Sequence, residues 1–105
     1  MKSILFYFLI ITISFQMENI TENEYGAELF NNNCSVCHLG GNNIIIPEKN
    51  LKFETLEANG MNTTSAIKYQ IINGKNGMPA FGGRLKEIEI EQIANYVLDS
   101  AKTKF

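Results

Sequence analysis

Cys34-Ser35-Val36-Cys37-His38 is the stretch that decides the fold, because two thiols and an imidazole at this spacing are the attachment signature of a c-type haem. The chain has 105 residues and contains no other cysteine and no other histidine. We expect Cys34 and Cys37 to form thioethers with the two vinyl groups of the porphyrin, and His38 to supply the proximal nitrogen of the iron. The motif therefore predicts one covalently bound haem c.

Three other interpretations of the two cysteines fit less well. A thioredoxin-like dithiol protein would need a preceding strand and a βαβ context, whereas the motif here is flanked by residues 25–33 and a Gly/Asn run. A closed zinc site would need a fourth Cys or His, which the chain lacks. A disulfide across two intervening residues would close a very short loop and restrict the unfolded chain little.

Residues 1–19 have the features of a cleavable signal peptide. Lys2 precedes an apolar run, Ile4–Phe15, and the first acidic residue is Glu18. A run of this length spans about 18 Å as helix, whereas a membrane span needs roughly 20 residues, so we expect a removable leader. A core helix is disfavoured because the run has no polar face. No Ala-x-Ala site occurs, and we place the cut between residues 14 and 22.

The remaining residues, 20–105, are expected to form one small domain, exported to a periplasm or a thylakoid lumen. A domain of this size is only marginally stabilised by its own core, and a buried porphyrin would supply much of the missing apolar contact. From Glu18 onward, eight Lys and Arg face eleven Asp and Glu, which argues against nucleic acid as a partner. Ile and Asn make up 27 of the 105 residues, a bias typical of an AT-rich genome such as that of a plastid.

Hydrophobic periodicity predicts helices and no strands, since no stretch shows the sustained alternation of a strand. Helices are expected over residues 23–33, 65–73 and 87–102, with a shorter helical turn within 49–58. Residues 62–64 offer an N-cap for the second helix, and Gly74 offers its stop. The residues expected to face inward on the last two helices are Ile67, Ile71, Ile72, Ile90, Ile93, Ala94, Val97 and Leu98.

Met78 is the candidate for the second iron ligand. Met1 and Met17 lie in or beside the leader, and Met61 precedes the capped start of a helix. Met78 alone lies in the loop 75–85, which is rich in glycine and proline and therefore expected to be functional. The structural alternative for any methionine is core packing. Ligation by His and Met fills both axial positions and raises the reduction potential, which predicts an electron carrier and not an enzyme.

Two further expectations concern the surroundings of the iron. The ring N–H of His38 that faces away from the metal should donate to a backbone carbonyl in residues 43–47, because such bonds orient metal-bound imidazoles. Arg84 follows Met78 by six residues in a net acidic chain. We expect it near the haem edge, where it could pair with a propionate or meet an acidic partner; the alternative is a solvated arginine without a role.

Several further stretches outside the haem motif are similar to those of a known protein family. They are Gly40-Gly41-Asn42-Asn43, Leu56-Glu57-Ala58-Asn59-Gly60-Met61, Asn73-Gly74-Lys75, Met78-Pro79-Ala80-Phe81-Gly82-Gly83-Arg84-Leu85 and Ala94-Asn95-Tyr96-Val97. With them the chain resembles the cytochrome c6 family, the small soluble class I cytochromes of algal and cyanobacterial photosynthesis. The resemblance covers nearly the whole chain after the leader.

The resemblance implies a fold and a role. The fold is the all-α fold of class I cytochrome c, with four to five short helices around the covalently attached haem. Its first and last helices cross at right angles, with Gly26 and Phe30 on the helix that meets Tyr96. The role is to carry electrons from cytochrome f of the cytochrome b6f complex to photosystem I, in the thylakoid lumen of a chloroplast or a bacterium, touching the membrane only peripherally. A periplasmic or respiratory cytochrome that donates to a terminal oxidase is the alternative.

Overall fold

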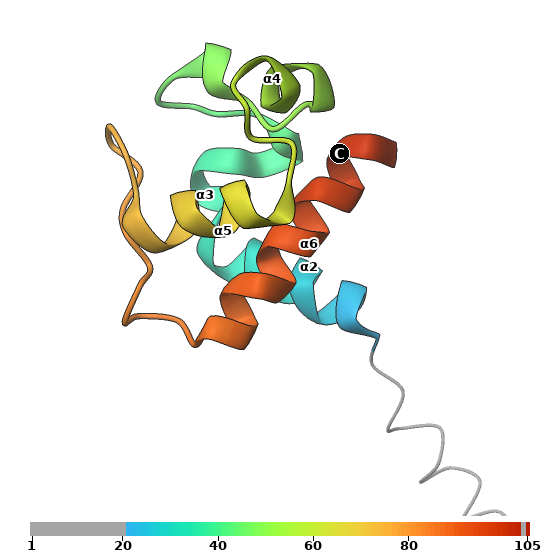
Figure 1. The fold of residues 1–105 in the computed structure, drawn as a ribbon, viewed down its shortest axis with the longest axis vertical. Helices are drawn as coiled ribbons and strands as arrows, with labels where there is room; N and C mark the ends of the chain where they lie inside the picture. Colours follow the sequence, from blue (N-terminus) through green and yellow to red (C-terminus); the bar gives the residue numbers. More distant parts are fainter. Residues whose placement is uncertain (1–20, 104) are drawn as a thin grey trace, which may run out of the picture.

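Two helices that are far apart in the sequence, α2 (Glu22–Asn33) and α6 (Glu87–Thr103), pack across each other (Figure 1). The computed structural model describes residues 21–103 and 105. The predicted signal peptide, residues 1–19, lies outside the described residues. None of the helices in the described part of the chain is long and apolar enough to cross a membrane.

Between α2 and α6 in the sequence, the chain forms three shorter α-helices and two 3₁₀ turns. In order these are α3 (Ser35–His38), η1 (Leu39–Gly41), η2 (Pro47–Lys49), α4 (Phe53–Ala58) and α5 (Thr64–Asn73). The described residues contain no strand, only two isolated bridges in the loop after α5. The prediction of an all-α domain with four to five short helices is confirmed.

Side chains at the helix ends explain where the helices begin and stop. Thr21 caps α2 with a capping box, in which its hydroxyl accepts the N–H of Glu24 at 3.1 Å and the Glu24 carboxylate accepts the N–H of Thr21 at 3.4 Å. The hydroxyl of Thr63 accepts the N–H of Ala66 and starts α5, and Gly74, with φ of 66°, ends it. The predicted boundaries of these helices were therefore correct to within one residue.

The crossing of α2 and α6 depends on Gly26. A Cβ atom at this position would lie 2.5 Å from the carbonyl oxygen of Gln92 and 2.9 Å from Cβ of Tyr96. Phe30, one turn further along α2, packs on the Tyr96 ring with centroids 5.3 Å apart. The contact expected between Gly26, Phe30 and Tyr96 is thus present, and glycine is required there because the two backbones approach so closely.

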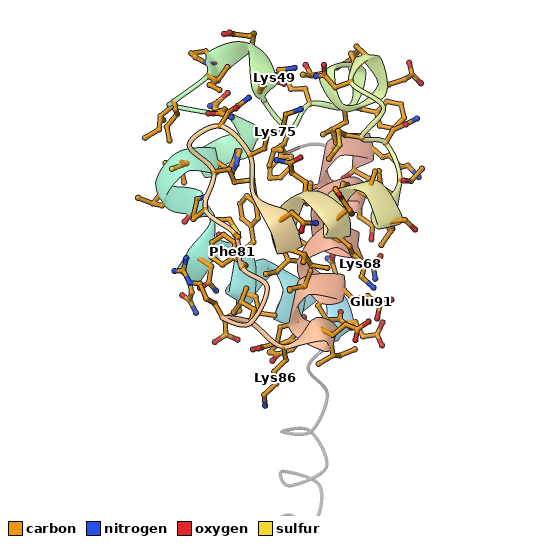
Figure 2. The ribbon with its side chains drawn as sticks, turned by 60° about the vertical axis from the view of Figure 1, so that its left-hand side comes forward. Lys49, Lys68, Lys75, Phe81, Lys86 and Glu91 are labelled. Carbon is orange, nitrogen blue, oxygen red and sulfur yellow. The ribbon has the colours of Figure 1, made fainter. Side chains whose placement is uncertain are left out.

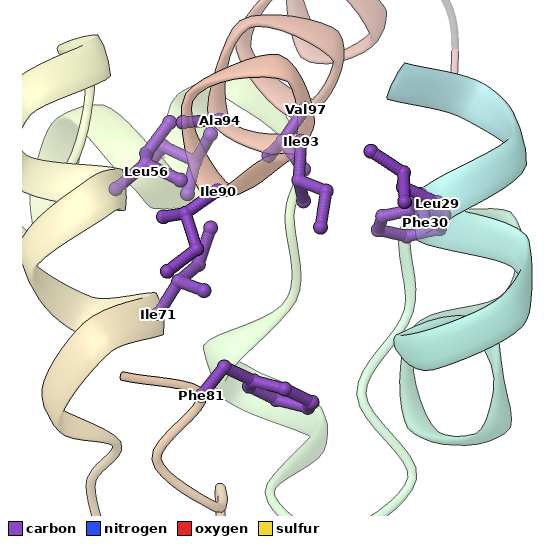
Figure 3. Close-up of a cluster of buried hydrophobic side chains, with 10 residues drawn as sticks. Leu29, Phe30, Leu56, Ile71, Phe81, Ile90, Ile93, Ala94 and Val97 are labelled. Atoms are coloured by element: carbon purple, nitrogen blue, oxygen red, sulfur yellow. The ribbon is translucent and has the colours of Figure 1, made fainter. Parts of the chain in front are cut away.

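The buried core is small and lies between α2, α5 and α6 (Figure 3). It comprises Leu29, Phe30, Leu56, Ile67, Ile71, Phe81, Ile90, Ile93, Ala94 and Val97. The inward positions predicted on α6 are buried, apart from Leu98, which is partly buried. On α5 the prediction for Ile72 was wrong: its side chain is exposed, because Ile67 and Ile71 already occupy the inner face and Ile72 lies about 100° further around the helix.

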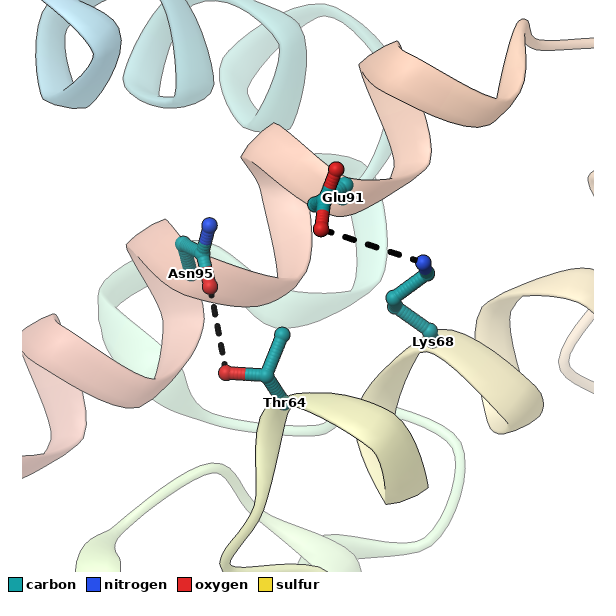
Figure 4. Close-up of polar contacts among 4 residues, drawn as sticks. All are labelled: Thr64, Lys68, Glu91 and Asn95. Atoms are coloured by element: carbon teal, nitrogen blue, oxygen red, sulfur yellow. Dashed lines mark hydrogen bonds and ion pairs between the residues drawn. The ribbon is translucent and has the colours of Figure 1, made fainter.

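Polar contacts align α5 with α6 at the surface (Figure 4). The hydroxyl of Thr64 donates to Oδ1 of Asn95 at 3.1 Å. Lys68 Nζ lies 4.0 Å from Oε1 of Glu91, an ion pair that is partly exposed and therefore contributes less than about 1 kcal/mol. The packing of Ile67 and Ile71 is the larger contribution to this contact.

Candidate functional site

A cavity of about 300 Å³ opens between the helices and the two loops that follow α3 and α5. Its apolar lining includes seven of the ten core residues: Phe30, Leu56, Ile67, Ile71, Phe81, Ile93 and Val97. The four residues predicted to bind the haem and its iron, Cys34, Cys37, His38 and Met78, line the same cavity. The structure therefore brings them together, from α3 and from a loop forty residues further along the sequence.

The haem motif itself forms the short helix α3, which the sequence analysis did not predict. The N–H groups of Cys37 and His38 both donate to the carbonyl oxygen of Cys34, at 3.1 and 2.9 Å. This turn places both sulfurs and the imidazole at the cavity wall. Burial, with a smaller contribution from the Cys37 thiol, raises the pKa of Cys34 to about 11, so the uncombined thiol stays protonated at neutral pH.

The orientation of His38 is fixed by one hydrogen bond. Its Nδ1 lies 2.9 Å from the backbone oxygen of Asn42. Because a carbonyl only accepts, Nδ1 carries the proton and Nε2 keeps the lone pair that an iron ion needs. The predicted type of partner, a backbone carbonyl, was correct, but the predicted range of 43–47 was wrong by one residue, because Gly40 and Gly41, with φ of 64° and 78°, turn the chain back already at Asn42.

Asn43 holds the rest of this proximal loop in shape. Its Oδ1 accepts the N–H groups of Ile45 and Ile46 at 3.0 and 2.9 Å, and its Nδ2 donates to the carbonyl oxygen of Lys49. Ile45 in turn reaches across to the loop that carries Met78: a Cβ on Gly77 would lie 3.4 Å from Cγ2 of Ile45. The loop that follows the haem motif and the loop that carries Met78 therefore meet at this point.

Met78 lies at the end of a tight hairpin. Lys75 and Met78 exchange both backbone hydrogen bonds, at 3.1 and 3.0 Å, and the residues between them, Asn76 and Gly77, have φ of 45° and 90°. Positive φ at both central positions is the geometry of a type I′ turn, for which Asn-Gly is the preferred sequence. That dipeptide indicates the hairpin within the segment 75–85, which was expected only to be a loop.

Gln70 on α5 is a neighbour of Met78 that the sequence analysis missed. Its Nε2 lies 3.9 Å from the sulfur of Met78, within reach of a weak N–H···S hydrogen bond. Gln70 lies eight residues before Met78 and on a different element, so no local motif links the two residues in the sequence.

Two charged residues belong to the lining of the cavity. They are Lys49, from η2, and Lys75, from the hairpin; Figure 2 labels both side chains. Arg84 does not line the cavity; its guanidinium lies 4.8 Å from the centroid of the Phe81 ring, which does. Arg84 therefore contacts a residue of the cavity lining without lining the cavity itself.

The residues of the cavity fit a haem. Its wall is largely apolar, as a porphyrin requires, two thiols and one imidazole belong to the lining, and Lys49 and Lys75 would supply positive charge for the propionates of a bound haem. When bound, the iron porphyrin supplies reversible one-electron chemistry. The protein contributes covalent anchorage, candidate axial ligands and a largely apolar enclosure.

A helical fold in which a Cys-x-x-Cys-His turn forms one wall of such a cavity defines a c-type cytochrome. A family model described as "Cytochrome C oxidase, cbb3-type, subunit III" matches residues 21–97. Cytochrome c6 of Bumilleriopsis filiformis is 61% identical over 79 residues, which cover 75% of this chain and 92% of that protein. The chain belongs to the cytochrome c6 family.

Two further comparisons extend this result. Cytochrome c6 of Cyanidioschyzon merolae is 48% identical over 102 residues, which cover 97% of each protein. The crystal structure of cytochrome c6 from the diatom Phaeodactylum tricornutum is similar with a TM-score of 0.74 and 49% identity, over 76% of this chain and 94% of that one. The protein is therefore an electron carrier of photosynthesis with one covalently bound haem c, and not an enzyme.

Proposed function

We propose that this protein carries single electrons from cytochrome f of the cytochrome b6f complex to photosystem I, in the thylakoid lumen of a plastid. Cys34 and Cys37 anchor the haem, and His38 and Met78 are its axial ligands. The observation that supports this most is the common cavity, which is lined by all four residues and enclosed by the core. Two occupied axial positions leave no site for substrate, which suits electron transfer.

The surface beside the haem motif supports docking to a partner. Val36, Leu39, Ile44 and Ile45 are exposed by 78, 71, 68 and 54%. Val36 lies within the motif, Leu39 directly follows it, and Ile44 and Ile45 lie in the loop after it. An apolar patch at the cofactor allows a partner to approach closely without binding tightly. Arg84 adds a positive charge held against Phe81, which could steer an acidic partner surface.

The respiratory alternative has one observation in its favour, namely that the matching family model is described as a cytochrome c oxidase subunit. The high identity to cytochrome c6 of algae favours the photosynthetic role. The test is to mix the reduced protein with photosystem I particles and measure the decay of the flash-oxidised reaction centre, and separately to measure oxygen uptake by terminal oxidase membranes. Fast reduction of photosystem I is expected; efficient turnover by the oxidase alone would contradict the proposal.

Arg84→Glu tests the docking role of this residue. Reversing a charge that steers a partner slows association, so reduction of photosystem I should slow several-fold at low salt and become less dependent on ionic strength. Lys86→Glu, the same charge reversal two residues away and outside the cavity lining, is the matched control. A changed reduction potential at an unchanged bimolecular rate would instead indicate that Arg84 pairs with a haem propionate. If neither the rate nor the potential changes, Arg84 has no role in either.

A further inference from the structure

Phe105, which follows α6, is held in an aromatic cluster. Its ring centroid lies 5.6 Å from that of Phe30 and 6.2 Å from that of Tyr96. Phe30 is 3% exposed and also lines the haem cavity, so it connects Phe105 with the site. Pairs of rings at such distances stabilise each other by about 1 kcal/mol beyond the area they bury, which makes the position of Phe105 well defined.

The side chain of Phe105 rests on Gly41. A Cβ on Gly41 would lie 2.5 Å from Cγ and 2.7 Å from Cβ of Phe105, so the ring occupies the space that any other residue would need. Gly41 is buried and has φ of 78°, which also favours glycine. The two observations together show a close and specific contact between Phe105, which lies beyond α6, and Gly41, the last residue of η1.

This contact borders the hydrogen bond of the proximal histidine. Gly41 directly precedes Asn42, whose carbonyl oxygen accepts from Nδ1 of His38. The carbonyl of Gly41 is held from its other side by the N–H of Leu51, at 2.7 Å. The segment that presents the acceptor to His38 is thus fixed by a backbone hydrogen bond and by the Phe105 ring.

We propose that Phe105 is a positioning residue for His38: its ring holds Gly41 in place, and thereby keeps the Asn42 carbonyl within hydrogen-bonding reach of Nδ1. This rests on the proposed ligation of the iron by His38. A strong bond at Nδ1 makes the imidazole a better donor and favours ferric iron. Loss of the ring should therefore weaken that bond and raise the reduction potential.

The test uses the haem-loaded protein with Phe105→Ala and two measurements. The midpoint potential should rise. The Nδ1 proton of His38, followed by nuclear magnetic resonance of the ferrous protein, should exchange with solvent roughly tenfold faster or more, because local opening controls this exchange. Phe105→Tyr keeps the ring and should restore both values. If Phe105→Ala does not retain its fold, Phe105→Leu is measured in its place.

Leu98→Ala is the control for a merely structural effect. Leu98 is also partly buried against the core and lies on α6, but it does not line the cavity. The substitution Leu98→Ala should lower the free energy of unfolding without changing the midpoint potential or the exchange rate of the His38 Nδ1 proton. Equal shifts in Leu98→Ala, or wild-type values in Phe105→Ala, would overturn the proposal. A wild-type spectrum without a histidine bound to iron would instead contradict the ligation itself.

Discussion

Each of the two candidate axial ligands has a hydrogen-bonding neighbour. The Asn42 carbonyl accepts from Nδ1 of His38, which leaves more electron density on the ring and at Nε2, whereas the Gln70 amide donates toward the Met78 sulfur and draws density away from it. With the proposed ligation, the first contact would favour ferric iron and the second ferrous iron. The two contacts would then adjust the reduction potential in opposite directions.

Met78→Ala should abolish the long-wavelength sulfur-to-iron absorption band of the ferric protein and lower the reduction potential, because thioether ligation favours ferrous iron. Visible absorption and redox titration measure both effects. Met61→Ala is the matched control, since Met61 lines the same cavity and its loss also removes an apolar side chain from the wall. If Met61→Ala abolishes the band and Met78→Ala does not, the ligand has been assigned to the wrong methionine.

Gln70→Leu should lower the reduction potential, because the sulfur of Met78 loses a hydrogen-bond donor and becomes a stronger ligand to ferric iron. A hydrogen bond worth about 1 kcal/mol corresponds to roughly 40 mV for a single electron, and a bond to sulfur should give less than this. Gln92→Leu makes the same chemical change on α6 outside the cavity lining. A potential that stays at the wild-type value in Gln70→Leu would rule out this role.

The four candidate haem residues that line the cavity could all be named from the sequence, because covalent haem attachment needs a local motif. Cys34, Cys37 and His38 are neighbours in the sequence, and Met78 is distinguished by its unusual loop. Gln70 could not be found in this way. Its link to Met78 exists only because α5 and the hairpin fold back on each other, which is a tertiary contact without a sequence pattern.

At the scale of elements, the position of Met78 depends on Gly74, at the junction of α5 and the hairpin. Gly74 has φ of 66° and ψ of 175°, a backbone region that is essentially restricted to glycine. A Cβ there would also lie 2.5 Å from the carbonyl oxygen of Met78 and 2.8 Å from the nitrogen of Ala80. The hairpin can turn back over the cavity only because this residue has no side chain.

Gly74→Ala should therefore displace the hairpin, weaken or abolish the sulfur-to-iron band, and lower the free energy of unfolding by more than about 2 kcal/mol. Spectra at neutral pH and denaturant titration measure these effects. Gly60→Ala provides the comparison, because Gly60 has the same φ of 66° but no atom within 4 Å of an added Cβ. It should cost about 1 kcal/mol and leave the band intact. An intact band in Gly74→Ala would show that Met78 does not depend on this turn.

The helices themselves were largely predictable, because caps and apolar stripes are local. Thr63 and Gly74 mark the ends of α5, and the stripe of α6 faces the core as its period predicts. The short helix α3 was not predicted. Its four residues carry no apolar period, and its turn is closed by backbone bonds to the Cys34 carbonyl. Helices of this length follow from their tertiary setting more than from propensity.

At the scale of the whole molecule, the crossing of α2 and α6 joins both ends of the domain. Gly26 permits the close approach, and Phe30, Tyr96 and Phe105 pack around it. The sequence predicted the crossing through its resemblance to a family and not through periodicity, since nothing local in α2 indicates which helix it meets. The contact of Phe105 with Gly41 was beyond prediction for the same reason.

Seven of the ten core residues also line the cavity, and this has a consequence for the protein before it receives its haem. In a chain that has not received its haem, water faces these seven residues, and a domain of this size has little other apolar contact to replace what the porphyrin would supply. Such a chain should be mostly unfolded, with little helical circular dichroism at 25 °C, and should be cut rapidly by a non-specific protease that spares the haem-loaded form. Attachment of the haem would then also decide whether each copy of the protein persists or is degraded by proteases. A native-like, protease-resistant apoprotein would contradict this.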